Sequence, residues 1–152
     1  MRSIVSIAAV LLIAGTVIIL TVMRAKEKPT PSIQTLTIGN ARLRVTFADT
    51  YKKREQGLSG RPSMPENEGM LFTFPVSGTW TFWMKDMLFD LDFIYINDGT
   101  VIALKEHIPA PRNNNGTVAI VEPTKEFDWM VEVNSGWIEK NIIKIGDRVT
   151  LL

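Results

Sequence analysis

The strongest constraint on this chain is an uncharged run of 20 residues near its start, from Ile4 to Met23. A helix rises 1.5 Å per residue, so a helical run of this length spans about 30 Å, the thickness of the hydrocarbon core of a bilayer. The run lacks the polar face that a helix packed on a soluble core presents to solvent. It therefore predicts an N-terminal transmembrane helix.

The same run is interpreted as a retained signal-anchor. The apolar region of a secretory signal peptide is about 7–15 residues long and ends at a small-residue cleavage site. Here the run is longer and ends in Val22-Met23-Arg24. Basic residues flank it on both sides, so the positive-inside rule leaves its orientation open. We expect residues 1–23 to anchor the chain, residues 24–34 to form a polar linker, and residues 35–152 to form an extracytoplasmic domain.

Composition excludes several classes of function. The chain has no cysteine and one histidine, so disulfides, thiolate metal sites, cysteine nucleophiles and two-histidine motifs are all impossible. Residues 30–152 carry 13 Lys and Arg against 15 Asp and Glu, which argues against binding nucleic acid through bulk positive charge. The basic residues beside the apolar run suit anionic lipid headgroups. We expect a membrane as a partner, no nucleic acid, and no cofactor or bound metal.

Residues 35–152 are typical of a mainly β domain. Apolar and polar residues alternate with period two in three segments, which predicts half-buried strands: Arg42–Phe47, Thr79–Lys85 and Phe127–Val133. Further strands are predicted at Thr35–Ile38, Gly69–Phe74, Leu91–Ile96, Thr100–Leu104 and Thr117–Glu122, with Ile142–Ile145 and Arg148–Leu152 closing the domain. Many short strands joined by turns favour a sandwich or a barrel.

Turn and cap residues mark the boundaries of these elements. Asn97-Asp98-Gly99 is typical of a tight hairpin turn between two strands. A short helix is predicted over Thr50–Gln56, with Thr50 as its cap and Gly57 at its end. A second turn of helix is expected within Ser135–Asn141. The domain should therefore carry one or two short helices.

Several segments in a fixed order resemble the domain of unknown function 192 family. They are Arg54, Gly57-Leu58, Arg61, Gly69-Met70-Leu71-Phe72, Phe82-Trp83-Met84-Lys85, Leu91-Asp92, Asp98-Gly99 and Gly146-Asp147. The resemblance covers roughly residues 36–152 and implies a compact jelly-roll-like β fold, without implying an activity. A Cys-Pro common in the family is absent here, and His107-Ile108-Pro109 lies near its place.

Charged residues in an aromatic-rich β domain form the first candidate site: Arg54, Arg61, Lys85 and Asp92, with Trp83 beside Lys85. Arginine offers a planar fork that suits a carboxylate, and a tryptophan face suits a sugar ring or a cation. The set predicts a groove for an envelope glycan or another anionic small ligand. The alternative interpretation is a structural salt-bridge network that joins the loop to the sheet.

Two other functions remain open from the sequence. Carboxylates near Asp86 and Asp92 would suit a hydrolase if two of them lay about 5–10 Å apart. Met84 and Met87, with Met70 and His107, have the soft ligands that suit Cu(I). His107 has no identifiable serine or aspartate partner in the sequence and is expected to be a loop residue. We favour binding over catalysis.

Overall fold

The computed structural model describes residues 33–111 and 119–152 of the chain. The apolar run Ile4–Met23 and almost all of the linker predicted for residues 24–34 lie outside these residues. Within the described part, no helix has both the length and the apolar character needed to cross a bilayer.

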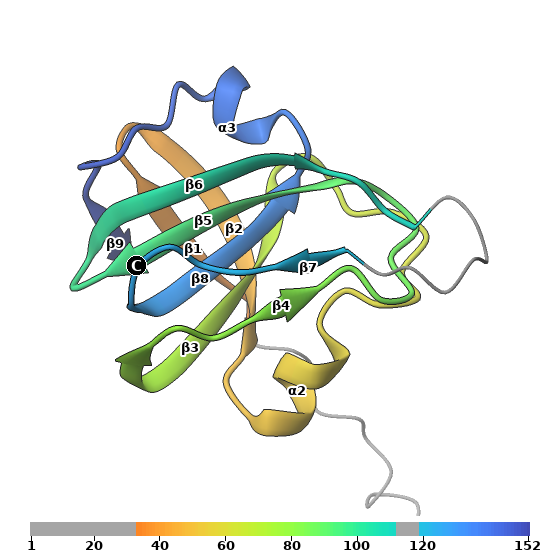
Figure 1. The fold of residues 1–152 in the computed structure, drawn as a ribbon. Coiled ribbons are helices and arrows are strands. Elements are labelled where there is room, and N and C mark those ends of the chain that lie inside the picture. Colours follow the sequence, from red (N-terminus) through yellow and green to blue (C-terminus); the bar gives the residue numbers. More distant parts are fainter. Residues whose placement is uncertain (1–32, 112–118) are drawn as a thin grey trace, which may run out of the picture. The chain divides into compact units, whose positions relative to one another are not determined.

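A seven-stranded sheet dominates the domain, in the order β6-β5-β8-β3-β2-β1-β9 (Figure 1). Its strands are β1 (Ile33–Ile38), β2 (Ala41–Ala48), β3 (Glu68–Gly78), β5 (Leu91–Asn97), β6 (Thr100–Ile108), β8 (Phe127–Asn134) and β9 (Val149–Leu151). Neighbouring strands are antiparallel except β2 and β3, which run parallel. A separate two-stranded ribbon pairs β4 (Phe82–Trp83) with β7 (Ile120–Val121).

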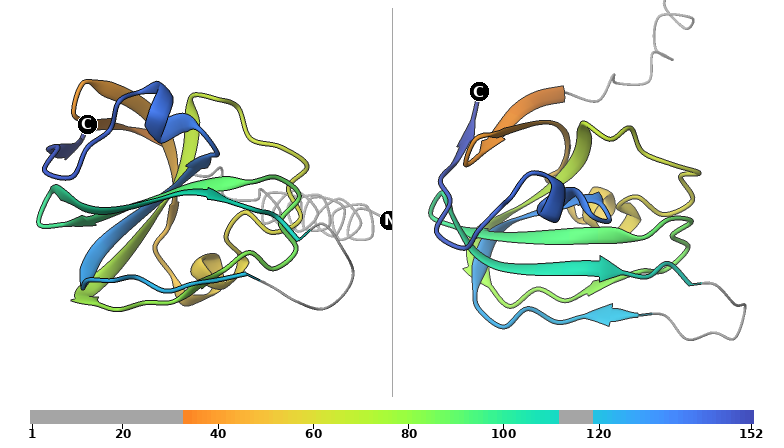
Figure 2. Two further views of the ribbon diagram at one scale, coloured as in Figure 1. Left: turned by 45° about the horizontal axis from the view of Figure 1, so that its top comes forward. Right: turned by 90° about the horizontal axis from the view of Figure 1, so that it is seen from above.

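The sheet curls until its two edge strands meet (Figures 1 and 2). A bridge joins Thr100, at the start of β6, to Arg148, just before β9. The backbone N–H of Val101 donates to the carbonyl of Asp147 at 2.9 Å, and the N–H of Val149 donates to the carbonyl of Gly99 at 2.9 Å. These bonds pair backbone groups that an open sheet would leave at its edges.

The central strands are buried on both faces. In β5, Phe93 and Tyr95 point to one side of the sheet, while Ile94 and Ile96 point to the other. The side of Ile94 faces the core enclosed by the curled sheet, with Trp137 and Ile138 of α3 (Trp137–Lys140) packed into it. The side of Phe93 faces a second core, rich in aromatic residues and methionine. Residues of the β4–β7 ribbon and of the loop after α2 (Tyr51–Gln56) complete that second core.

Most predicted elements are confirmed. Thr50 caps α2 by accepting a hydrogen bond from the backbone N–H of Lys53, and Gly57 ends the helix at a φ of 49°. The turn between β5 and β6 places Asp98 and Gly99 at positive φ, as the type I′ turn of a two-residue hairpin loop requires. The fold is therefore mainly β, with a curled sheet and two short helices.

Several elements differ from their predicted extents, and β3 and β6 each run four residues beyond the predicted end. The alternating segment 79–85 forms a strand only at Phe82–Trp83, because its partner β7 is two residues long. Residues 142–145 form no strand, and Ile142 has a φ of 55°, which no regular strand allows. β1 starts at Ile33, two residues before the predicted strand. The parallel pairing of β2 with β3 was not expected, since strand patterns alone do not give pairing order.

Candidate functional site

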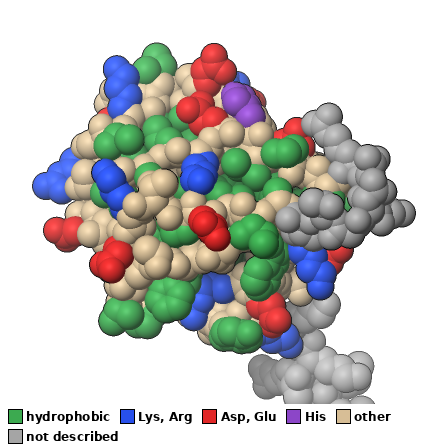
Figure 3. Space-filling view, viewed as in Figure 1, with side chains coloured by type: hydrophobic (Ala, Val, Ile, Leu, Met, Phe, Trp, Pro, Cys, Tyr) green, Lys and Arg blue, Asp and Glu red, His purple; other side chains and the backbone are tan. Residues whose placement is uncertain are grey.

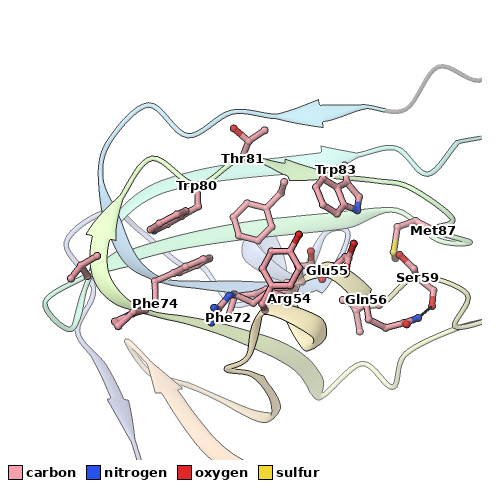
Figure 4. A pocket seen from close by; sticks show the side chains of 17 residues that line it. Arg54, Glu55, Gln56, Ser59, Phe72, Phe74, Trp80, Thr81, Trp83 and Met87 are labelled. Carbon is pink, nitrogen blue, oxygen red and sulfur yellow. Dashed lines mark hydrogen bonds between the residues drawn. The ribbon is translucent and has the colours of Figure 1, made fainter.

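A cavity of about 320 Å³ lies on the aromatic side of the sheet, between α2, β3 and the segment that contains β4 (Figure 4). Its apolar walls are Phe72 and Phe74 of β3, Trp80, Phe82 and Trp83, with Met87 beyond them. Polar groups come from α2 and the turn after it, from Thr81, and from β8: Tyr51, Arg54, Glu55, Gln56, Ser59 and Glu132. The cavity is thus an apolar chamber with a few placed polar groups, as small-ligand sites commonly are.

The turn after α2 fixes one wall of the cavity. Gly57 takes the left-handed region, and a Cβ built there would lie 3.5 Å from the ring of Phe72. The Ser59 hydroxyl then donates to the carbonyl of Lys85 at 2.8 Å. The backbone N–H of Gly60 donates to the carbonyl of Asp86, also at 2.8 Å. These bonds tie the helical wall to the chain just after β4.

Stacked rings form the opposite end of the cavity. Phe74 and Trp80 stack with their centroids 4.9 Å apart and their planes 5° from parallel. Trp80 lies over Gly78, where a Cβ would come within 3.1 Å of the indole. The pairing register of β3 with β8 shifts between Thr73 and Gly78, so this end of β3 leaves the regular sheet. Figure 4 shows Trp80 and Phe74 at one end of the cavity, and Ser59 and Met87 at the other.

Arg54 is held in the cavity wall by two contacts. It is half-buried, and its Nη1 donates to the carbonyl of Thr73 at 2.8 Å. Its guanidinium carbon also lies 5.0 Å from the centroid of the Phe74 ring, within the range of a cation–π contact. The contacts orient a permanent positive charge at the aromatic wall.

Glu132 brings a carboxyl group to the same cavity from the centre of the sheet. It lies opposite Met70 of β3 and Phe93 of β5, and its side chain is 5% exposed. Its Oε2 has no hydrogen-bond partner among the described residues. Burial raises the pKa of Glu132 to about 8, although the positive charge of Arg61 acts in the opposite direction. At neutral pH the group is therefore mainly a neutral acid that can donate a hydrogen bond.

Tyr95 of β5 is a second buried titratable group on the aromatic side of the sheet. Its hydroxyl is buried and also lacks a partner among the described residues. Burial raises the pKa of Tyr95 far above its ordinary value, and the negative charge of an ionised Glu132 raises it further. Two unsatisfied polar groups thus interact within one apolar core, which is costly unless something else binds there.

The five residues predicted for the site do not all meet. Arg54 and Trp83 line the cavity, and Trp83 is 46% exposed at its mouth. Arg61 and Lys85 are exposed and do not line it. The guanidinium of Arg61 nevertheless acts electrostatically on Glu132.

Asp92, the fifth residue, lies outside the cavity and is fully buried. Its Oδ1 accepts a hydrogen bond from the backbone N–H of His107 at 2.9 Å, and its Oδ2 accepts one from the N–H of Ile138 at 3.1 Å. The carboxylate thus joins β5 to the end of β6 and to α3. This is a structural role, although not the salt bridge that the sequence suggested.

Glu132 was missed because the alternation in β8 places it on the polar face, with Asp128. That assignment assumes that one face of the strand is exposed to solvent, but β8 is a central strand and is covered on both sides. Met130, between Asp128 and Glu132, was the available signal, because an apolar residue on a supposed polar face indicates that this face is covered. The sequence could not show what covers it.

The residues of the two alternative functions are not gathered at this cavity, although Met87 lines it. Asp86 lies exposed in a turn, whereas the Asp92 carboxylate is buried and already accepts two bonds. Met84 and Met87 are buried in the aromatic core, while His107 is exposed. His107 does have a partner that the sequence did not reveal, since its Nδ1 lies 2.9 Å from the hydroxyl of Ser135. No cluster of three or more His, Asp or Glu side chains suited to a metal occurs in the described residues.

Fold and site together define a curled, mainly β domain with an aromatic cavity and a buried acid. The chain belongs to the DUF192 family, described as "Uncharacterized ACR", whose model matches residues 34–151. The family expected from the sequence motifs is therefore confirmed. No curated protein matches the chain by sequence.

Two solved structures share the fold. One is a Sinorhizobium meliloti 1021 protein described as a "putative transcription regulator", with 27% identity and a TM-score of 0.72. The match covers 82% of this chain and 98% of that one. The other is a protein of unknown function from Novosphingobium aromaticivorans DSM 12444, with 23% identity and a TM-score of 0.70. The match covers 82% of this chain and 94% of that protein.

Proposed function

We propose that this domain is a binding module for a small ligand with a flat apolar part and an anionic group. The observation that carries the proposal is the aromatic cavity, with an oriented arginine in its wall. Its volume of about 320 Å³ is at the lower end of the range for small-molecule sites, which favours a ligand of one or two rings.

Each wall supplies a different part of the recognition. Phe72, Phe82 and Trp83 offer ring faces and edges to a planar apolar body. Arg54 keeps further N–H donors besides the one that bonds Thr73, and a guanidinium fork suits a carboxylate or sulfonate. Of the two ligand classes expected from the sequence, the anionic small molecule is favoured over the glycan, because a sugar would need more polar partners than these walls provide.

The other candidate functions have less support. The description of the Sinorhizobium protein belongs to that protein, and the slight negative charge of residues 30–152 does not favour a phosphate backbone. A hydrolase would need two free carboxylates, whereas Asp92 is buried and already accepts two backbone hydrogen bonds. A copper site would need His107 with the buried methionines, whereas His107 is exposed. The membrane anchor and an extracytoplasmic place for the domain remain part of the proposal, based on the apolar run alone.

The test is a binding titration on residues 31–152. These residues form a unit with its own core, and the two solved neighbours consist almost wholly of the matching fold, so the unit is suitable for study alone. The probe is naphthalene-2-sulfonate, a planar aromatic anion of two rings, followed by fluorescence and by thermal unfolding. Glucuronate and a chitin oligomer serve as the sugar ligands. A ligand at 100 times its Kd adds about 2.7 kcal/mol to stability, or several degrees in Tm.

Trp83→Ala should weaken binding of the aromatic anion at least tenfold while changing Tm little, because this indole is half exposed. Leu88→Ala is the matched control, since Leu88 is an exposed apolar residue that does not line the cavity. Saturable binding that Trp83→Ala weakens and Leu88→Ala does not supports the proposal. Binding of the sugars alone, or equal effects of the two variants, would refute it.

A further inference from the structure

The polar group deepest in the cavity wall belongs to a residue that sequence patterns did not single out. Glu132 projects from the central strand β8, between β3 and β5, whereas Arg54 stands on the helix that covers the cavity. A buried carboxyl oxygen without a partner loses its hydration and receives nothing in exchange. Such a group in a cavity wall is either a cost that folding tolerates or one half of a contact that a ligand completes.

We propose that Glu132 is the specificity-determining residue of this cavity and donates a hydrogen bond from its neutral carboxyl to a carbonyl-type oxygen on the buried end of the ligand. This rests on the proposed binding function and extends it to the chemistry of the ligand's inner end. The complete ligand is then a planar apolar body, with an anionic group towards Arg54 and an uncharged acceptor towards Glu132.

The surroundings of Glu132 favour an acceptor over a cation. Arg61 acts on the carboxyl group from the loop after α2, and Arg54 lines the same cavity, so a ligand cation would meet two positive charges. Among the described residues that line the cavity, Glu55 is the one other acid, and it is exposed on α2. From β5, Tyr95 adds a hydroxyl that is neutral at physiological pH. Burial holds the pKa of Glu132 near 8, which agrees with a donor role below that pH.

The proposed hydrogen bond from Glu132 is tested with two probes of nearly equal shape, 2-acetylnaphthalene and 2-isopropenylnaphthalene. They differ only in that the carbonyl oxygen of the first is replaced by a methylene group in the second. At pH 6.5 the protein should bind the ketone about tenfold more tightly than the alkene. That preference should fall towards unity as the pH rises through about 8, because an ionised carboxylate has no proton to donate. 2-Naphthylmethylammonium is the cationic probe.

Two substitutions separate donation from packing. Glu132→Gln keeps an N–H donor and cannot ionise, so the ketone preference should persist from pH 6.5 to 9.5. Glu132→Met keeps the length of the side chain without a donor, so the two neutral probes should bind equally at every pH. Tm and near-ultraviolet circular dichroism establish that each variant is folded, and Glu132→Gln alone decides the question if Glu132→Met is not.

The outcomes distinguish this inference from the function on which it rests. Equal binding of ketone and alkene by the unsubstituted protein at pH 6.5 overturns the role of Glu132 and leaves the binding function standing. A tighter affinity for the ammonium probe, growing as pH rises, overturns the donor role in favour of an ion pair. If neither naphthalene nor the aromatic sulfonate binds, both proposals fail.

Discussion

The guanidinium carbon of Arg54 lies 5.0 Å from the centroid of the Phe74 ring, and Phe74 itself stacks on Trp80. The helix α2 and the strand β3 are thereby joined through a charged group and an aromatic surface. A hydrogen bond from Arg54 to the carbonyl of Thr73 fixes the same joint. The arrangement orients the cation and the ring face that the proposed ligand would use. Figure 3 shows hydrophobic side chains exposed on this view of the molecule, interspersed with single charges.

Arg54→Ala should lower the affinity for the aromatic sulfonate about tenfold or more, because a charge-assisted hydrogen bond contributes roughly 1.5–3 kcal/mol. Arg54→Lys should recover part of the loss, since it restores charge without the planar fork. Calorimetric titration of residues 31–152 measures both effects. Lys85→Ala, which removes an exposed cation outside the cavity, is the control. An equal loss in the control would mean that the probe responds to overall charge.

Asp92→Asn should reduce the free energy of unfolding by about 1–3 kcal/mol, because one acceptor becomes an N–H group facing a backbone N–H donor. The affinity of the folded domain for the aromatic sulfonate should not change. Urea unfolding gives the first quantity and a titration gives the second. Asp86→Asn is the matched control, since Asp86 is exposed and sits at a φ of 57°, which asparagine tolerates. A stable Asp92→Asn variant with weakened binding would return Asp92 to the binding site.

Glu132 should make the domain less stable as the pH rises. Its pKa is about 8 in the folded state against an ordinary value of 4.5, so the folded state keeps a proton that the unfolded chain releases between these values. The free energy of unfolding therefore falls across that window, by roughly 5 kcal/mol, and is constant again at higher pH. Glu132→Gln cannot titrate and should lack this decline. Urea unfolding at pH 5, 7 and 9 measures the difference between the two proteins. Parallel pH profiles for them would show that burial does not perturb this carboxyl.

Gly69→Ala should destabilise the domain by about 1–3 kcal/mol, because the new Cβ would lie 2.8 Å from both the carbonyl oxygen of Glu132 and a methyl group of Leu43. The new methyl group cannot move away from either contact, because backbone lies on one side of it and packed core on the other. Gly60→Ala makes an informative comparison, since a Cβ there meets nothing within 4 Å but the residue has a φ of 74°. It should cost about 1 kcal/mol from backbone strain alone. Thermal unfolding compares the stability of the two variants. A larger loss of stability for Gly60→Ala than for Gly69→Ala would contradict the crowding at Gly69.

Local patterns were sufficient where the structure is decided locally. Thr50 and Gly57 bound α2 as expected, since a cap and a left-handed end depend on the residues themselves. The turn at Asp98 and Gly99 follows for the same reason. In residues 79–85 the alternation predicted that Phe82 is buried and Trp83 exposed, but it also placed Trp80 on the face of Phe82, and Trp80 is exposed. The segment forms only a two-residue strand, paired with the equally short β7. Alternation predicts which side chains face inward where the strand is paired, and does not predict how far a ladder extends.

The candidate site was predictable only in part. Arg54 and Trp83 were expected in it, because an arginine and a tryptophan beside strong strands suit ligand binding, and both line the cavity. Lys85, Arg61 and Asp92 were grouped with them as charged residues of an aromatic-rich β domain. The fold instead directs Lys85 and Arg61 to solvent and places Asp92 against two backbone donors.

The sequence by itself determined the mainly β class, the family, the helix caps, the hairpin turn and which residues alternate in each strand, because these depend on side chains a few positions apart. Tertiary structure alone decided that β8 lies in the middle of a curled sheet, covered on both faces. That placement converts Glu132 from an apparent surface residue into a buried acid in an aromatic cavity. The physical reason is that burial, and with it the proton affinity of a carboxyl group, depends on which distant segments cover it, and a strand's own sequence does not contain that information.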